Sequence, residues 1–304
     1  MAHIPVLKKE VLEYLDITPN KNFVDCTIGE GGHTAAILEK NKPEGKVLGI
    51  EADSELYQGL KQQIKGIQNP KLKIRNRLIL VNDSYTNLEK IVEREGFRPM
   101  HGVLFDLGLS SWHLEKSGRG FSFLRDEPLD MKYHRKFQIN ELTAAEIVNS
   151  WPQKEIEKVL RIYGEEKFSK KIAKEIIKKR QVRPIKTTFQ LVTVIKGAVP
   201  ENYEKGRIHP ATRTFQALRI SVNNELQNLQ EALPQALNVL ETEGRLVLIS
   251  FHSLEDRIVK YFFQTKTEEN ILKILTKKPV RPSEKEVREN PRSRSAKLRV
   301  AQKV

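Results

Sequence analysis

The sequence has a single cysteine, Cys26, in 304 residues. A disulfide needs two cysteines and a cysteine-ligated zinc site needs several, so this chain can form neither, and no other set of metal ligands is predicted. No run of about 18 consecutive apolar residues occurs, and residues 1–10 lack the apolar core of a signal peptide. We therefore expect a soluble protein of a reducing, cytoplasmic compartment, without a membrane partner.

A glycine-rich turn follows the strand-like run 22–25, and two residues that it lacks limit the classes of ligand it is expected to bind. The turn Gly29-Glu30-Gly31-Gly32-His33 lacks the last glycine of the dinucleotide fingerprint and the lysine of a P-loop, which disfavours NAD and nucleoside triphosphates. Glycines still allow a backbone to approach a ligand closely, and the helix that follows offers free N–H groups. A glycine cluster without any ligand is the alternative that this turn alone leaves open.

Acidic residues are in deficit, because 39 Asp and Glu stand against 53 Lys and Arg, for a formal net charge of +14. A strongly basic chain favours a polyanionic partner, most often a nucleic acid, although a solvated basic surface is the alternative. The basic tail 277–304 is compatible with either an ordered arm or a loose one.

The chain length suggests about two domains, and the order of apolar patterns suggests how they are arranged. Strand-like and helix-like runs alternate, which predicts an α/β domain with a parallel sheet; the expected strands are 22–25, 46–50, 78–81, 102–106 and 245–250. Between about residues 113 and 210 there are few strand signals and several helical patterns, at 144–149, 153–163, 169–180 and 188–198. A long helical pattern at 214–240, with a break near Pro234, and a helix from Leu254 complete the α/β part. We predict one discontinuous domain, 1–112 and 211–304, and an inserted helical domain, 113–210.

Polar residues stand where the predicted strands end, and the carboxyl ends of parallel strands share one edge of a sheet. Glu51 follows the second strand and suits the hydroxyls of a ribose, while Tyr85 could stack on an adenine, with Asp83 beside it. Asp106 ends the fourth strand, where an acid would favour a sulfonium cation. These features favour S-adenosyl-L-methionine as the cofactor, with its carboxylate on the N–H groups near Gly31.

Motifs along the whole chain resemble those of the RsmH/MraW methyltransferases, which modify the exocyclic N4 of a cytidine in the decoding centre of bacterial 16S ribosomal RNA. The similar segments are His3–Val6, Asp25–His33, Asp106–Ser111, Arg119–Phe123, Pro128–Met131, Tyr163–Glu166, His209–Arg219, Ser250–Arg257 and Asn290–Ser295.

The resemblance implies a Rossmann-like class I S-adenosylmethionine methyltransferase domain with an inserted all-helical domain that recognises RNA. It also implies a set of cofactor contacts: Gly31, Gly32, His33, Glu51, Tyr85, Asp106 and His113. Two positions depart from the family pattern, which commonly has Asp in place of Glu51 and Gln in place of His113. The implied partner is 16S rRNA, within the small ribosomal subunit, and homodimerisation is left open.

Methylation of an exocyclic amine needs a group that holds an amine hydrogen while the nitrogen lone pair attacks the methyl group. Asp106 and Ser110 are the candidates for this catalytic role, whereas Cys26 belongs to the cofactor strand. Related amino-methyltransferases often carry Asn, Asp or Ser followed by Pro-Pro and an aromatic here, which this chain lacks. An Asp106 that merely caps the following turn is the alternative.

Cations and aromatic side chains outside this edge are candidates for contact with RNA, because guanidinium groups bind phosphates and rings stack on unpaired bases. The candidate RNA-binding residues are Arg119, His209, Arg213, Arg219, His252, Arg257, Arg292 and Arg294. His252 and Ser253 do not form the nucleophile elbow of a hydrolase. A helix cap by Ser253, in a capping box with Asp256, is the alternative role of this loop.

The sequence thus predicts an S-adenosylmethionine-dependent rRNA cytosine-N4 methyltransferase. Two alternatives stay open: a non-catalytic ribosome assembly factor that binds the same cofactor, and a DNA cytosine-N4 methyltransferase.

Overall fold

A computed structural model describes residues 4–66, 74–133, 142–203 and 208–304 of the chain, so His3 of the N-terminal motif lies outside it. The chain forms two compact units, one made of Met1–Gly108 and Leu226–Val304 and the other of Leu109–Glu225. The second unit therefore extends beyond residue 210, where the sequence had ended the helical insertion. The roles assigned to the two domains, methyl transfer and RNA recognition, stay predictions.

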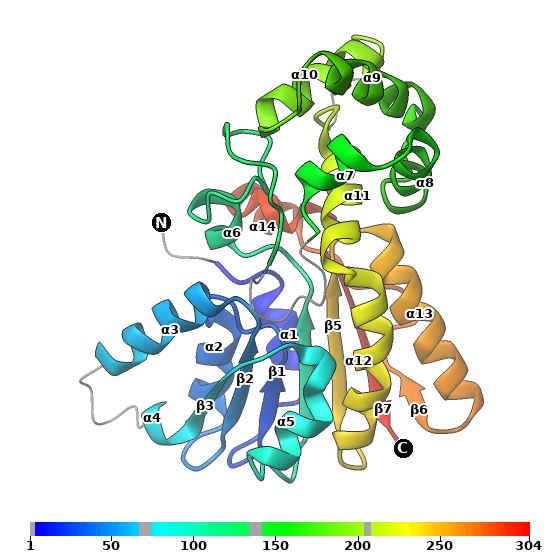
Figure 1. Ribbon diagram of the computed structural model, residues 1–304. Helices are drawn as coiled ribbons and strands as arrows, with labels where there is room; N and C mark the ends of the chain where they lie inside the picture. Colours follow the sequence, from blue (N-terminus) through cyan, green and yellow to red (C-terminus); the bar gives the residue numbers. More distant parts are fainter. Residues whose placement is uncertain (1–3, 67–73, 134–141, 204–207) are drawn as a thin grey trace. The chain divides into compact units, whose positions relative to one another are not determined.

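The first unit is built on a seven-stranded sheet in the order β3-β2-β1-β4-β5-β7-β6 (Figure 1). The strands are β1 Phe23–Asp25, β2 Val47–Glu51, β3 Leu78–Asn82, β4 Gly102–Asp106, β5 Arg245–Ser250, β6 Leu272–Ile274 and β7 Lys297–Lys303. β1 to β5 pair in parallel, as the alternation of strands and helices predicted, whereas β7 runs antiparallel to both of its neighbours. The α/β Rossmann-like prediction and its five strands are confirmed.

Helices cover both faces of this sheet, as expected for parallel strands joined by crossovers. They are α1 Lys8–Tyr14, α2 Gly32–Lys40, α3 Ser54–Gly66, α4 Ile74–Arg77, α5 Leu88–Arg94, α12 Glu225–Val239, α13 Ser253–Glu268 and α14 Glu284–Glu289, with two short 3-10 helices, η2 Tyr85–Asn87 and η4 Pro291–Ser295. Apolar side chains of α5, α12 and α13 share one buried core with the sheet, and those of α1 and α2 share the other. None of the helices in the described residues is long and apolar enough to cross a membrane.

The strand order creates a place for a ligand. β1 lies between β2 and β4, so the chain leaves β1 toward one side and returns on the other, and such a switch point opens a crevice at the carboxyl ends of the strands. The backbone N–H of Cys26 bonds to the carbonyl of Leu104, and the N–H of Asp106 then donates to the Thr27 hydroxyl instead of to a strand carbonyl. The glycine-rich turn begins directly after this bond.

The basic C-terminal segment is ordered, which settles the question that its composition left open. β7 pairs with β5 over six residues from Lys297 to Gln302 and brings Leu298 and Val300 into the core with no exposed surface. β6 and β7 were missed in the sequence because cations alternate with apolar residues in them. Lys303 directs its ammonium group to the carbonyls of Leu237 and Leu240, so its charge does not prevent burial of the strand.

The break expected near Pro234 is wrong. The long helical pattern is interrupted instead at Asn224, whose φ of 50° and ψ of 35° end α11 (Thr212–Asn223) before α12 begins. Asparagine tolerates this left-handed conformation better than most residues. Pro234 lies on the exposed side of α12, where water can bond to the carbonyl that loses its helical N–H partner.

The second unit is helical and has a core of its own. Its helices are α6 Ser111–Glu115, α7 Ala144–Ser150, α8 Gln153–Tyr163, α9 Ser169–Val182, α10 Thr188–Ala198 and α11. Apolar residues at helical spacing, among them Ile156, Ile172 and Leu191, are completely buried between these helices. The four helices predicted between residues 144 and 198 are confirmed.

Burial of β7 makes a first prediction. Leu298→Ala should lower the free energy of unfolding by roughly 2–5 kcal/mol, because it leaves a cavity in a fully buried strand. Arg294→Ala, at an exposed position of η4, should change it by about 0.5 kcal/mol or less. Urea unfolding of both variants measures the difference, and equal effects would mean that the C-terminal strand is not part of the cooperative core.

Candidate active site

The glycine-rich turn adopts a backbone that other residues rarely take. Gly29 and Gly31 have φ values of 54° and 80°, and Gly31 caps the N-terminus of α2. A Cβ on Gly32 would lie 3.0 Å from Cγ of Pro5, so the backbone there is also close to a neighbouring segment. The first N–H groups of α2 have no acceptor within the helix, which suits them to a carboxylate of a ligand.

Glu51, at the end of β2, is oriented by two backbone N–H groups. Gly29 donates to Oε2 at 3.1 Å and Asp53 donates to Oε1 at 2.8 Å, which ties the glycine-rich turn to the second strand. Burial raises the pKa of the Glu51 carboxyl to about 7, against the opposing effect of these donors. Asp53 itself caps α3 by accepting from the N–H groups of Glu55 and Leu56.

Asp25, at the end of β1, is an acid of this edge that the sequence analysis did not assign. It accepts from the Thr34 hydroxyl at 2.7 Å and from the Thr27 N–H at 3.2 Å, and it is 1% exposed. Burial raises the pKa of the Asp25 carboxyl, although Thr34 and the nearby His33 oppose the shift. Its place at a strand end, like that of Asp106, was the signal that could have revealed it.

Asp106 and His33 meet at the same edge. Nε2 of His33 lies 3.5 Å from Oδ2 of Asp106, and the Asp106 N–H donates to the Thr27 hydroxyl at 2.7 Å. The His33 ring is 6% exposed, and its two nitrogens have no hydrogen-bond partner within the protein. The carboxylate of Asp106, with 17% of its side chain exposed, is open to a ligand or substrate.

The remaining predicted groups at the strand ends have defined places. Tyr85 packs edge-on against Phe105 of β4, with the ring centroids 5.7 Å apart, so its ring borders the core next to the crevice. Asp83 accepts from the Asn87 amide at 2.9 Å and lies 3.5 Å from the Arg94 guanidinium. Asp83 is thus already held by protein donors.

Gly108 follows β4 and Cys26 follows β1 at the same edge of the sheet. A Cβ on Gly108 would lie 2.7 Å from the ring of Phe251, so the chain after β4 passes close to the loop after β5. Cys26 is 2% exposed, and burial together with Asp25 raises the pKa of its thiol well above the ordinary value. A buried thiol of this kind is a poor nucleophile.

Ser110 and His113 belong to the second unit and contact each other. The Ser110 hydroxyl caps α6 by accepting from the His113 N–H at 3.2 Å, and it lies 2.7 Å from Nδ1 of the same histidine. The His113 ring is enclosed by the rings of Trp112, Phe121 and Tyr133, with centroids 5.2 to 5.3 Å away. The cofactor role of His113 and the catalytic role of Ser110 stay predictions.

Comparison with known proteins identifies the family. The sequence model described as the MraW methylase family matches residues 1–304. The chain belongs to this family. Two relatives named ribosomal RNA small subunit methyltransferase H are each 44% identical to it: that of Sulfurihydrogenibium azorense, aligned over 100% of both chains, and that of Dehalococcoides mccartyi, aligned over 99% of this chain and 86% of the relative. The family predicted from the motifs is confirmed.

Solved structures are more distant from this MraW-family methylase. An rRNA methylase from Streptococcus thermophilus has a TM-score of 0.45 at 12% identity, over 100% of this chain and 99% of that one. An O-methyltransferase from Bacillus cereus has a TM-score of 0.48 at 7% identity, over 99% and 84% of the two chains. The family assignment therefore comes from the sequence match.

Two of the cations predicted to bind RNA are engaged within the second unit of this methylase. Arg119 is 4% exposed, donates to the Tyr133 carbonyl at 2.8 Å and lies over the Trp112 ring. Arg219 forms a bidentate pair with Glu225, with N–O distances of 2.8 and 3.0 Å. Both side chains hold the helical unit together, so an RNA contact would compete with these bonds.

The other RNA candidates differ in exposure. Arg257, Arg292 and Arg294 are exposed, whereas Arg213 is half-buried and donates to the carbonyl of Glu165 at 3.2 Å. His209 stacks on Phe123 with the ring centroids 4.5 Å apart. RNA binding by all of these residues stays a prediction.

The alternative role of this loop, a helix cap by Ser253, is wrong. His252 is the N-cap of α13: its Nδ1 accepts from the Glu255 N–H at 3.3 Å, and the Glu255 carboxylate accepts from the N–H groups of Phe251 and His252. Asp256 turns away and pairs with Arg299 at 2.6 Å. An imidazole acceptor can replace a hydroxyl here because the capping geometry needs only an acceptor at that position.

The raised pKa of Glu51 gives a prediction about stability. Between pH 4.5 and about 7 the folded protein keeps a proton that the unfolded chain has released, so this group's contribution to the free energy of unfolding falls as the pH rises through that window. Glu51→Gln removes the effect. Relative to that variant, the free energy of unfolding of the wild type should fall by up to roughly 3 kcal/mol as the pH rises across this window.

Urea unfolding of both proteins without added ligand, at the two ends of that window, measures this loss. If the stability difference between wild type and variant is the same at both ends, Glu51 is already ionised in the folded protein and the assignment fails.

Proposed function

We propose that this protein transfers a methyl group from S-adenosyl-L-methionine to the exocyclic N4 of a cytidine in the decoding centre of 16S rRNA. Membership of the MraW methylase family and the names of the relatives support an rRNA methyltransferase. The acids at the carboxyl edge of the sheet support the cofactor, and the chemistry available to Asp106 supports an amine as the methyl acceptor.

The residues at this edge fit the cofactor. Its carboxylate would take N–H groups from the turn at Gly31, and its ribose hydroxyls would donate to the Glu51 carboxylate, which is already oriented by Gly29. When bound, S-adenosylmethionine supplies an electrophilic methyl group on a positively charged sulfur. Buried carboxyls such as Asp25 and the more open Asp106 make the edge favourable for that charge.

The observation that carries the proposal is the exposure of Asp106 among the acids of this edge. Asp25 is buried and Glu51 nearly so, whereas Asp106 keeps a carboxylate oxygen accessible at the switch point of the sheet. An accessible carboxylate can accept a hydrogen of a cytosine amine, which directs the nitrogen lone pair toward the methyl group.

Asp106 can also take the proton that the amine releases once it carries the methyl group. His33 lies beside it, with Nε2 3.5 Å from Oδ2, where the imidazole can help to orient the Asp106 carboxylate. The Thr27 hydroxyl fixes the backbone of Asp106 from the other side. We assign Asp106 as the group that contacts the amine and His33 as its positioning residue.

Transfer of a labelled methyl group tests the function directly. Purified small ribosomal subunits lacking the modification, naked 16S rRNA and duplex DNA are offered as substrates, and nucleosides are identified by mass spectrometry. N4-methylcytidine from the RNA substrates supports the proposal. Cofactor binding without any methylated cytidine would favour a non-catalytic assembly factor, and methylation of the duplex would favour a DNA enzyme.

Substitution of the proposed amine acceptor gives a sharper prediction. Asp106→Asn keeps the shape of the side chain but removes the charge and the proton acceptor, so turnover should fall roughly 100- to 1000-fold. The charge-matched control is Asp16→Asn, because Asp16 is exposed and pairs with Arg245 at the start of β5. Calorimetric cofactor binding shows whether the site persists; turnover near that of the wild type would remove Asp106 from the mechanism.

The ribose contact assigned to Glu51 predicts a pH-dependent cofactor affinity. Ribose hydroxyls donate best to the ionised carboxylate, and the pKa of Glu51 is about 7. The affinity for the cofactor should therefore rise roughly ten-fold between about one pH unit below this pKa and about one unit above it. Calorimetry on wild type and Glu51→Gln tests this. The variant should bind the cofactor more weakly, and its affinity should not change with pH in this range. The same pH dependence in both proteins would mean that a group other than Glu51 causes it.

A further inference from the structure

Residues 4–7 of the first unit, here named the N-terminal strap, contain a backbone feature that the candidate active site does not explain. Leu7 has a φ of 52° and a ψ of 36°, a left-handed conformation that residues other than glycine rarely adopt, and its side chain is completely buried. Such a backbone persists only where the surrounding structure fixes it, and it is common at ligand-binding segments. The strap therefore needs a partner that holds it in place.

Side chains from the other end of the chain hold the strap. The Leu7 N–H donates to Oε1 of Glu286 in α14 at 2.7 Å, and the side-chain amide of Asn290, directly after α14, donates to the Ile4 carbonyl at 3.1 Å. The two bonds join residues that are 279 and 286 positions apart in the sequence. The C-terminal segment thus fixes the N-terminal one.

Glu286 makes this contact in place of a bond within its own helix. Ser283 caps α14 by accepting from the Glu286 N–H at 3.1 Å, and a glutamate at this position commonly returns a bond to the N–H of the cap residue. The helices α7, α10 and α13 have this reciprocal pair. In α14 the glutamate accepts from Leu7 instead. A side chain diverted from its local role points to a role in holding the strap.

The strap packs against the start of α2, where the cofactor carboxylate is expected. For a Cβ built on Gly32, the three nearest atoms would all belong to the ring of Pro5, at 3.0 to 3.3 Å. Gly32 is the first residue of α2 and follows the cap Gly31, so its N–H is one of those without an acceptor within the helix. The ring of proline is rigid, so this contact restricts movement of the turn.

Apolar contacts support the same connection. Val6 and Leu7 of the strap share one buried core with Ile37 of α2 and with Ala296, which lies between η4 and β7. Closely packed cores transmit a displacement of one element to its neighbours. A change at α14 should therefore reach the glycine-rich turn through the strap.

We propose that Glu286 is a positioning residue for the cofactor. By fixing Leu7 it keeps Pro5 against Gly32, and so it holds the N–H groups that bind the carboxylate of S-adenosyl-L-methionine. The inference rests on the proposed function only for the place of the cofactor at this turn. Glu286 itself contacts the strap and acts on the cofactor through it.

Replacement of the acceptor at residue 286 gives the first test. Glu286→Ala leaves the Leu7 N–H without this acceptor and should weaken binding of S-adenosyl-L-methionine, measured by calorimetry, roughly ten-fold. Glu286→Gln keeps an acceptor oxygen and should bind within about two-fold of the wild type. The matched control is Glu284→Ala, at an exposed position in the first turn of the same helix. Equal losses in both alanine variants, or no loss in either, would overturn the inference.

A double-mutant cycle tests whether Glu286 acts through the strap. Pro5→Ala removes ring atoms that face Gly32 and should weaken cofactor binding by a factor similar to that of Glu286→Ala. If Glu286 acts by holding Pro5, then Glu286→Ala in the Pro5→Ala background should add less than about two-fold. Losses that multiply, as expected for independent sites, would overturn the proposed connection.

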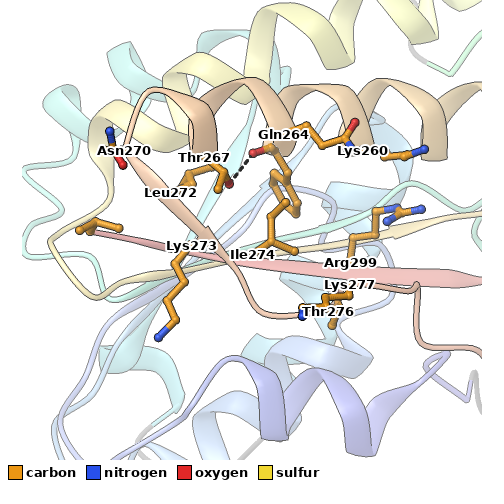
Figure 2. A pocket seen from close by; sticks show the side chains of 12 residues that line it. Lys260, Gln264, Thr267, Asn270, Leu272, Lys273, Ile274, Thr276, Lys277 and Arg299 are labelled. Atoms are coloured by element: carbon orange, nitrogen blue, oxygen red, sulfur yellow. Dashed lines mark hydrogen bonds between the residues drawn. The ribbon is translucent and has the colours of Figure 1, made fainter.

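A destabilised variant from the opposite end of the sheet controls for a general loss of stability. Leu272 of β6 is 2% exposed and lines a cavity of about 640 Å³ between α13 and the strands β6 and β7 (Figure 2). β6 pairs with the part of β7 that faces Arg245 and Leu246, at the amino end of β5. Leu272→Ala should lower the urea midpoint and leave cofactor binding unchanged. A loss of affinity equal to that of Glu286→Ala would overturn the inference.

Kinetic constants separate the inference from the proposed function. In Glu286→Ala the KM for S-adenosyl-L-methionine should rise roughly ten-fold, whereas kcat and the KM for small ribosomal subunits should stay within about two-fold of the wild type. Calorimetry needs no RNA, so it decides on Glu286 even for a protein that methylates no cytidine. If the native protein methylates cytidine but all variants bind the cofactor alike, the proposed function stands and the assignment of Glu286 alone fails. A native protein that does not bind the cofactor would overturn both.

Discussion

The site depends on the burial of carboxyl groups at one edge of the parallel sheet. Asp25, Glu51 and Asp106 end three neighbouring strands, and removing such groups from water costs free energy unless donors replace it. The donors come from local backbone and hydroxyl groups, among them the N–H of Gly29 and the hydroxyl of Thr34. The glycine-rich turn therefore orients Glu51, through the N–H of Gly29, at the edge where we propose that the cofactor binds.

This electrostatic arrangement favours a cationic ligand. Burial raises the pKa values of Asp25 and Glu51, so both carboxyls hold their protons more strongly than in water. A positive charge or a hydrogen-bond donor that arrives beside them would lower these pKa values and favour the ionised form. The sulfonium of S-adenosylmethionine carries a positive charge, and its ribose hydroxyls are hydrogen-bond donors. The strand order changes direction at β1 and β4, and Asp106 at the end of β4 keeps 17% of its side chain exposed. The strand order thus determines where Asp106 lies relative to the other acids of this edge.

Much of this could be predicted from the sequence because the signals are local. The apolar runs that form β1 to β5 and the acids that follow β2 and β4 are readable without any structure. The antiparallel strands β6 and β7 were not, since Lys297, Arg299 and Lys303 disguise a buried strand and only pairing with β5 reveals it. The helix break at Asn224 and the cap by His252 were missed because neither residue type is the commonest one for its role. Asp25 was missed as a site residue because its partners Thr34 and His33 come together only when α2 folds back on β1.

The excess of basic residues shows how burial changes the interpretation of a charge count. Arg77 is 4% exposed and donates to the carbonyls of Leu38 and Gly45 at the end of α2, and Arg119 and Arg219 hold the helical unit in the same way. Such cations cannot release their partners for phosphate without loss of stability. The net charge of +14 therefore overstates the number of cations that are available to a polyanionic partner.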